Sequence, residues 1–411
     1  MKTAKFKDSP LGPIPQDWEV KTIAEFGQVV TGSTPPRGDK DNWNGDFPWI
    51  SAQDFGGKYI RESVENISEK GKKFCRLLPA DSVLVTCIAS IGLNAIVKIE
   101  CATNQQINAV ICEKGSPDFL YYTMEFNKAR FLTLAGQTAV PIINKGQFET
   151  FTVPYPPLEE QQRIAEALGE VDKLIESLDE QIEKKRLIAK GVAHDLLSAK
   201  KRLPGFKGEW KNVRLGDIGE IIRGVSYSPN NAHSSFVDGT IKLLRANNVQ
   251  EGRIIFNDLV YVDSQCVSQE QRMLRGDILI CAANGSKELV GKAASIDYDF
   301  ETTFGAFMMV LRPNSEITGR FLKHYFVSHQ YRNQLDDVLT GSAINNLNGK
   351  AVCKFTVALP LSLAEQQAIA DLLSEQDAAI AALEAKREKY VCIKEGMMRD
   401  LLTGKVRMRG E

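Results

Sequence analysis

The sequence has few of the residues from which catalytic and metal sites are usually built, and it shows no signal for membrane insertion. Histidine occurs only four times in 411 residues, and none of the eight cysteines forms a Cys-x-x-Cys pair. This argues against a zinc site or a disulfide framework and suits a reducing cytoplasm, where we expect the chain to act. No apolar run approaches the roughly 20 residues that span a bilayer, and the N-terminus lacks the apolar segment of a secretory signal. We expect no membrane partner.

Neither the net charge nor the search for catalytic motifs indicates an enzyme. The 51 basic and 52 acidic side chains leave a net charge of −1, so any nucleic-acid surface must be local. Gly285–Lys292 resembles a phosphate-binding loop, but five residues separate its glycines and Ala293 replaces the hydroxyl residue that would meet magnesium. A turn between strands is the better interpretation. Because no nucleophile elbow or dinucleotide fingerprint is present either, we expect no catalytic residue, metal or cofactor in this chain.

The chain does contain a long internal repeat. Glu160-Gln-Gln162 recurs 205 residues later as Glu365-Gln-Gln367, and Asp195-Leu-Leu197 recurs at the same offset as Asp400-Leu-Leu402. A period of this length is not that of a solenoid, which is roughly 20–50 residues. Two similar modules can present two similar surfaces to a repetitive or nearly two-fold symmetric partner, for which DNA is the leading candidate. Further upstream, the residues that match at an offset of 192 are Trp18 with Trp210, Gly27 with Gly219, and Gly32 with Gly224.

The pattern predicts an α+β protein with four segments, since one core seldom serves so long a chain. Residues 1–158 and 201–363 form two similar mixed domains, and residues 159–200 and 364–411 form two long helices, the second with a C-terminal tail. We expect the helices to form an antiparallel coiled coil that separates the domains with pseudo-two-fold symmetry. A first-domain helix is expected from Asp118 to Leu134, and short apolar runs there predict strands: Val83–Val85, Ala95–Val97, Ala109–Ile111 and Phe151–Val153.

Heptad spacing supports the two long helices. Apolar residues alternate in steps of four and three from Ile164 to Leu196, with one break at Lys185. The alternative for each helix is simple packing on its own domain. Ser362 and Glu365 fit a capping box at the start of the second helix. The second seam is weaker because three of its positions are polar: Gln376, Arg387 and Lys394.

Polar loops beside the expected strands carry residue types suited to DNA. The loops Thr31–Gly45 and Arg223–His233 occupy the same place in the two halves, and both contain arginine, asparagine and an aromatic residue. Arginine and asparagine can read guanine and adenine edges, and clustered basic residues can meet phosphates. For any single residue, a solvated turn is the alternative interpretation.

The candidate DNA-binding residues share this chemistry and these loop positions. In the first half they are Arg37, Lys40, Asn42, Trp43, Lys72, Lys73, Arg76, Asn104, Gln105, Asn144 and Lys145. In the second half they are Arg223, Tyr227, Asn230, Asn231, Arg245, Asn247, Ser286, Lys287, Asn345 and Asn348.

Five motifs occur in a fixed order in the first half: Thr31-Gly-Ser-Thr-Pro-Pro36, Phe47-Pro-Trp-Ile-Ser51, Ser90-Ile-Gly92, Thr103-Asn-Gln-Gln-Ile107 and Pro156-Pro-Leu-Glu-Glu-Gln-Gln162. With these motifs the chain resembles the specificity (S) subunits of type I restriction–modification enzymes over nearly its whole length. In the second half the helix-opening motif returns as Leu359-Pro-Leu-Ser-Leu-Ala-Glu-Gln-Gln367, whereas Thr302-Thr-Phe-Gly-Ala306 departs from the family pattern at the place of Asn-Gln-Gln.

The resemblance implies a non-catalytic subunit in which two target-recognition domains each read one half of a bipartite site in double-stranded DNA. It implies that the helices set the spacer and dock two methyltransferase (modification) subunits, which bind S-adenosylmethionine and methylate adenine. Restriction subunits with translocase and nuclease activity join the larger complex. Two other hypotheses remain open from the residues alone. One is a coiled-coil protein scaffold without DNA specificity, and the other is an enzyme with an unrecognised site.

Overall fold

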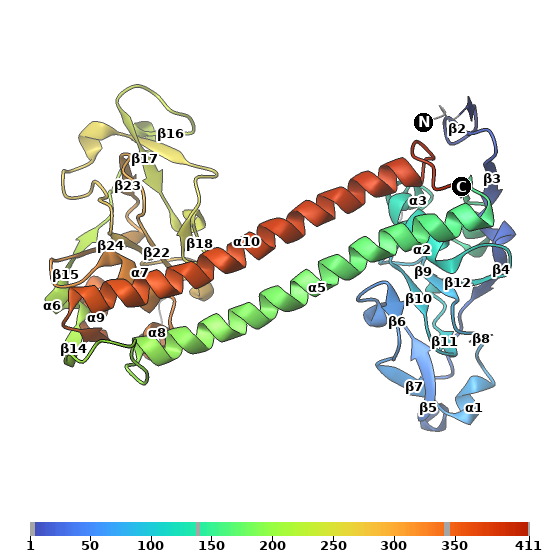
Figure 1. Ribbon diagram of the computed structural model, residues 1–411, viewed down its shortest axis with the longest axis horizontal. Coiled ribbons are helices and arrows are strands. Elements are labelled where there is room, and N and C mark those ends of the chain that lie inside the picture. Colours follow the sequence, from blue (N-terminus) through green and yellow to red (C-terminus); the bar gives the residue numbers. More distant parts are fainter. Residues whose placement is uncertain (1–4, 137–139, 341–345, 410–411) are drawn as a thin grey trace. The chain divides into compact units, whose positions relative to one another are not determined.

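The computed structural model describes residues 5–136, 140–340 and 346–409, and the chain divides into two compact units (Figure 1). The first unit comprises Met1–Asp179 and Ala385–Glu411, and the second comprises Glu180–Glu384. Each unit therefore contains one mixed domain together with part of each of the two long helices. Those helices are α5 (Leu158–Leu197) and α10 (Leu363–Leu401). Among the described residues, no helix is both long enough and apolar enough to cross a membrane.

The first unit is built on two sheets, with strand orders β4-β12-β9-β10-β6 and β7-β5-β11-β8. The predicted strands are present as β9, β10, β12 and β13. β9 has the sequence Val-Leu-Val-Thr and is buried along its whole length, as expected for a β-branched strand covered on both faces. The strands are β1 (Phe6–Lys7), β2 (Ile14–Pro15), β3 (Glu19–Thr22), β4 (Gly27–Thr31), β5 (Trp43–Ile50), β6 (Tyr59–Ile60), β7 (Glu65–Ile67), β8 (Leu77–Leu78), β9 (Val83–Thr86), β10 (Asn94–Val97), β11 (Cys101–Thr103), β12 (Ile107–Cys112) and β13 (Thr152–Tyr155).

The second unit repeats this plan with sheets ordered β15-β24-β21-β22 and β16-β20-β17-β23. In both units a short strand runs parallel to a longer neighbour: β11 beside β5 in the first, and β23 beside β17 in the second. The strands are β14 (Trp210–Arg214), β15 (Gly219–Arg223), β16 (Ala232–His233), β17 (Thr240–Leu244), β18 (Val249–Gln250), β19 (Arg253–Ile254), β20 (Val260–Asp263), β21 (Ile278–Cys281), β22 (Ala293–Ser295), β23 (Thr302–Phe304), β24 (Met308–Pro313) and β25 (Thr356–Pro360).

The short helices that follow β12 in the first unit and β24 in the second come in matching order. The helix expected over Asp118–Leu134 is two helices, because Asn127 leaves the helical conformation and caps the first of them. The phosphate-loop-like segment is a turn between β21 and β22, as predicted. The helices are α1 (Glu69–Lys72), α2 (Pro117–Phe126), α3 (Lys128–Leu132) and α4 (Lys145–Glu149) in the first unit, and α6 (Leu215–Ile218), α7 (Gly319–Phe326), α8 (His329–Thr340) and α9 (Gly349–Lys354) in the second.

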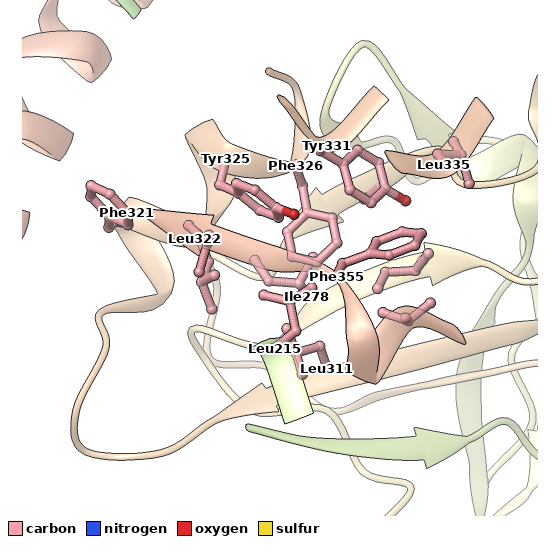
Figure 2. Packing of buried hydrophobic residues seen from close by; sticks show 14 of the residues in the cluster. Leu215, Ile278, Leu311, Phe321, Leu322, Tyr325, Phe326, Tyr331, Leu335 and Phe355 are labelled. Atoms are coloured by element: carbon pink, nitrogen blue, oxygen red, sulfur yellow. The ribbon is translucent and has the colours of Figure 1, made fainter. Parts of the chain in front are cut away.

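Each core is completed by the end of a long helix. In the second unit, Leu196 and Leu197 at the end of α5 belong to the cluster in which Tyr325, Tyr331 and Phe355 pack together (Figure 2). The residues that correspond to them at the end of α10, Leu401 and Leu402, are buried in the core of the first unit. The repeated Asp-Leu-Leu sequence therefore supplies the two leucines that dock each helix end on a core.

A buried carboxylate explains the repeated glutamate of the Glu-Gln-Gln motif in the first unit. Glu160 is 4 % exposed and accepts hydrogen bonds from Trp18 Nε1 at 2.9 Å and from Arg407 Nε at 2.7 Å. Arg407 Nη2 donates a further bond at 2.7 Å, and the Met408 amide donates to the carboxylate at 3.1 Å. Burial alone raises the pKa of Glu160, but the Arg407 and Trp18 bonds outweigh it and lower the pKa overall. The segment that follows α10 is thereby fastened to the start of α5.

The second unit repeats the arrangement with Glu365, Trp210 and Arg202. Arg202 donates from Nε at 3.0 Å and from Nη2 at 2.6 Å, and Trp210 Nε1 donates at 3.2 Å. This arrangement corrects the expected capping box. The Ser362 hydroxyl does accept from the Glu365 amide at 3.4 Å, but the Glu365 carboxylate binds Arg202 and Trp210 instead of the cap.

Ion pairs join the α5 and α10 segments within each unit. In the first unit Asp172 pairs with Lys394 and Asp179 with Arg387, both at 2.5 Å, so residue numbers rise along α5 while they fall along α10. In the second unit Arg186 pairs with Glu384 at 2.6 Å. The polar residues Arg387 and Lys394 of the second seam therefore have acidic partners on α5, which accounts for their occurrence among apolar positions.

Candidate nucleic-acid interface

In the first unit, the predicted loop folds around Arg37. Its guanidinium donates two hydrogen bonds to Glu65, at 2.7 and 2.9 Å, and lies 3.8 Å from the ring centroid of Trp43. This bidentate contact with Arg37 lowers the pKa of Glu65. The buried Asn42 donates to the Pro36 carbonyl at 3.2 Å, and Trp43 Nε1 donates to the same oxygen at 3.3 Å. The Asn42 side chain is thus buried and stabilises the loop from within, whereas the Arg37 side chain is exposed on the loop surface.

The predicted residues Lys72, Lys73 and Arg76 form a basic cluster with Lys70, and this cluster lies against the loop. Lys70 pairs with Asp39 at 2.7 Å, and Arg76 donates to the Thr31 carbonyl at 2.5 Å. Lys72 pairs with Glu69 at 2.9 Å and lies over the Phe47 ring. These contacts place a surface of exposed cations beside the loop, and the exposed ones among the predicted residues are Arg37, Lys40, Lys73 and Arg76. Such a surface can meet phosphates, which at Arg37 would compete with the Glu65 carboxylate.

Two predicted asparagines begin helices. Asn144 Oδ1 accepts from the Gln147 amide at 2.9 Å and caps α4, and Asn348 Oδ1 accepts from the Ala351 amide at 2.9 Å and caps α9. Both side chains are therefore engaged in equivalent N-caps. Lys145, next to the first of them, pairs with Glu149 at 3.3 Å.

In the second unit, three predicted residues meet at one cavity of about 970 Å³: Tyr227, Arg245 and Asn247. Arg245 Nη2 donates to the Asp258 carboxylate at 2.9 Å, and Asn247 Nδ2 donates to the same oxygen at 3.0 Å. The buried Arg245 Nε has no hydrogen-bond partner within the described ranges. This cavity is therefore lined by a hydroxyl, a guanidinium and an amide that can offer hydrogen bonds to base edges.

Other predicted residues of the second unit lie outside that lining. Asn231 donates to Asp263 at 3.0 Å, and His233 shares the same carboxylate at 2.9 Å, which lowers the pKa of Asp263. Arg223 ends β15. Asn230 and Lys287 are exposed in short 3-10 helices, Ser286 is exposed directly before the second of these, and Asn345 lies outside the described residues.

Phe307 is the most exposed large hydrophobic residue among the lining residues that the sequence reasoning missed. Phe307 contributes to the lining and is 73 % exposed, on the turn between β23 and β24. A phenylalanine directly before a strand resembles a core residue in a single sequence, so only its exposure marks it. In the parts of the chain that the structure describes, no group of three histidine, cysteine or acidic side chains is placed to hold a metal ion.

Comparison with known proteins assigns the family. The family model for the type I restriction modification DNA specificity domain matches residues 15–185 and again residues 207–391. The chain belongs to this family of type I DNA specificity proteins. Two copies of a DNA specificity domain favour DNA sequence recognition over the protein-scaffold alternative.

Relatives and solved structures agree with the family. The MjaVIII specificity subunit of Methanocaldococcus jannaschii is 24% identical, with 99% of this chain and 97% of the relative covered. The EcoKI specificity subunit of Escherichia coli is 34% identical over 48% of this chain and 42% of its own length. A type I restriction–modification S subunit from M. genitalium has the same fold, with a TM-score of 0.60 at 17% identity over 97% of this chain and 99% of that one.

Proposed function

We propose that this chain is the non-catalytic DNA-recognition subunit of a type I restriction–modification complex. Each mixed domain reads one half of a bipartite site, residues 1–158 one half and residues 201–363 the other. The repeated specificity domain carries this proposal, because two copies of one DNA-reading fold on a single chain match a target with two separate halves. Exposed cations in the first unit supply phosphate contacts, and the second-unit cavity lined by Tyr227, Arg245 and Asn247 supplies base contacts.

The two helical segments, residues 159–200 and 364–411, form an antiparallel coiled coil that sets the spacer between the half-sites. The opposite numbering of the Asp172–Lys394 and Asp179–Arg387 pairs supports this arrangement. A helix of 40 residues spans about 60 Å, which lies between one and two turns of DNA. Lengthening both helices by the same number of residues would therefore lengthen the spacer.

The partners are double-stranded DNA, two methyltransferase subunits and, in the larger complex, restriction subunits. S-adenosylmethionine binds the methyltransferase subunits, and this chain holds no cofactor of its own. The α5 segment of the second unit exposes the adjacent apolar side chains Leu187 and Ile188, at 63 % and 54 %. An exposed pair of apolar side chains on an otherwise charged helix indicates a surface that a partner protein covers. Glutamate at both positions should abolish co-purification with the methyltransferase subunit.

Methylation mapping tests the function directly. Cells would express the chain with its cognate methyltransferase subunit, and methylated adenines would be mapped across the genome. The expected result is a split motif, one half of which changes when the loop Arg223–His233 is replaced by that of another family member. A stable complex that methylates no defined sequence would contradict the proposal and restore the scaffold hypothesis.

A further inference from the structure

One turn is held identically in the two units. In the first, the turn Asn104–Gln106 joins β11 to β12. The Asn104 amide donates to the Ile50 carbonyl at 3.1 Å, and the Ile107 amide closes the turn onto Asn104 at 3.2 Å. The Cys87 amide donates to the Gln106 carbonyl at 2.7 Å. Strand ends on both sides therefore fix the backbone of this turn.

The turn Gly305–Phe307 of the second unit repeats each of these bonds. The Gly305 amide donates to the Leu244 carbonyl at 3.0 Å, the Met308 amide to Gly305 at 2.8 Å, and the Ala282 amide to the Phe307 carbonyl at 2.9 Å. These bonds correct the correspondence expected from the sequence. Asn104–Gln106 matches Gly305–Phe307, whereas the sequence motifs place it two residues earlier, at 303–305. All of these bonds join backbone groups, so the side chains of the turn can change without disturbing it.

The repeated glycines of the loops explain why the turn and the loop lie in contact. A Cβ atom on Gly32 would lie 2.1 Å from the Asn104 carbonyl oxygen, and a Cβ on Gly224 would lie 2.0 Å from that of Gly305. Only glycine permits this approach. The sequence repeat therefore preserves a backbone contact that holds the polar loop against the turn in both units.

The side chains on the two turns differ in chemistry. Gln105 is exposed and accepts a hydrogen bond from the Thr34 hydroxyl of the first loop. In the second unit the same turn exposes Phe307, which matches Gln106 and so lies one residue beyond the place of Gln105, at the cavity lined by Tyr227, Arg245 and Asn247. A large apolar ring on a rigid turn, left 73 % exposed, adds little to the core. It is available to a ligand.

We propose that this turn is a base-reading position common to both units, with amide readout in the first and apolar readout by Phe307 in the second. An amide reads adenine in the major groove, whereas an apolar side chain contacts the 5-methyl group of thymine. The inference rests on the proposed function and deepens it, because it names how one duplicated backbone reads two different half-sites. Phe307 is thus a specificity-determining residue for a thymine in the half-site of the second unit.

Deoxyuridine substitution tests the methyl contact. Once the motif is known, the purified complex with methyltransferase subunits would be titrated with duplexes in which each thymine of that half-site is replaced in turn. Removing the contacted methyl should weaken wild-type binding roughly fourfold. The Phe307→Gln variant should bind both duplexes equally, and Phe307→Leu should keep part of the discrimination. A half-site without a sensitive thymine, or a penalty that survives in Phe307→Gln, would overturn the inference.

Methylation mapping separates the remaining outcomes. Phe307→Gln should relax one base position in the half assigned to the loop Arg223–His233 and leave the other half unchanged. Leu274→Gln, an exposed apolar residue outside the cavity lining, is the matched control and should change nothing. Loss of the complex in Phe307→Gln would make Phe307 a protein-docking residue and refute base reading. A defined wild-type motif with an unaltered variant motif refutes only this inference, whereas no wild-type motif refutes the proposed function.

Grafting gives a second, positive test. A Cβ on Gly305 would meet the Leu243 side chain at 3.5 Å, an ordinary contact. The triple variant Gly305→Asn, Ala306→Gln and Phe307→Gln, which transfers the turn of the first unit, should therefore fold and assemble. We expect it to replace the thymine preference at that one position with another base. An unchanged motif in an assembled complex would again overturn the inference.

Discussion

Replacing Arg407 with methionine should destabilise the first unit strongly, although the exchange removes a single surface-proximal cation from the segment after α10. Arg407 supplies two of the four hydrogen bonds to the Glu160 carboxylate, the others coming from Trp18 and Met408. Both side chains of the pair are largely buried, at 10 % and 5 % exposure. The variant leaves a buried carboxylate without its cation.

The expected loss follows from that burial. Removing one partner of a buried ion pair costs about 3–5 kcal/mol, because the remaining charge stays desolvated. For a unit of this size each kcal/mol lowers the unfolding midpoint by about 2–4 °C, so the shift should be roughly 6–20 °C. Adding Glu160→Gln to the Arg407→Met variant should recover most of this loss, since the double variant buries no charge and the new side-chain amide oxygen can still accept from Trp18.

Urea unfolding and calorimetry at neutral pH measure these differences as a double-mutant cycle. Arg409→Ala is the control, because Arg409 is 60 % exposed and pairs with the half-exposed Asp17 at 3.1 Å. That control should change stability by less than about 1 kcal/mol. If Arg407→Met behaved like Arg409→Ala, or if the double variant were no more stable than the single one, the reasoning from burial would be wrong.

The loop glycine, the cysteines and the acid dependence of Glu160 give three further tests. Gly224→Ala should cost about 1–3 kcal/mol and displace the turn at Gly305, because its Cβ would lie 2.0 Å from a carbonyl oxygen; urea unfolding together with methylation mapping would check it, and wild-type behaviour would contradict it. Cys392 should react with a thiol reagent in the folded chain and Cys101 only after unfolding, since Cys392 is exposed and burial raises the pKa of Cys101 to about 12; equal rates would count against this fold. The folded-state pKa of Glu160 lies below its ordinary value of 4.5, so its contribution to stability is present above pH 4.5 and is lost as the pH falls through the lowered pKa. The free energies of unfolding of wild type and Glu160→Gln should therefore converge on acidification. A difference in unfolding free energy that stays constant with pH would refute this.

The sequence alone was enough to predict the duplicated plan, four of the first domain's strands (β9, β10, β12 and β13) and both long helices. Apolar spacing and a repeat at a fixed offset are visible in the sequence itself, so spacing predicts that Ile164 and Leu196 lie on one side of a helix. Only the structure shows that Ile164 is buried in the core of the first unit and Leu196 in that of the second. Polar residues in such a seam are harder to interpret. In the sequence, Lys394 interrupts the apolar spacing of the second helix. Its ion pair with Asp172 on the other helix explains why a lysine occupies this position.

At the candidate interface, too, the sequence predicts residue chemistry, whereas the tertiary structure decides exposure. Residue type and loop position led us to propose Arg37 and Arg245 as DNA-binding residues, because their side-chain chemistry is visible in the sequence. Which loop residues face outward was decided by tertiary structure: Asn42 turns into its own loop, and Phe307, which resembles a core residue, is exposed. Glu365 likewise matched a capping box by spacing, yet it binds Arg202 from a distant segment. Local pattern determines the elements, whereas contacts between residues far apart in the chain determine which side chains remain free to read DNA.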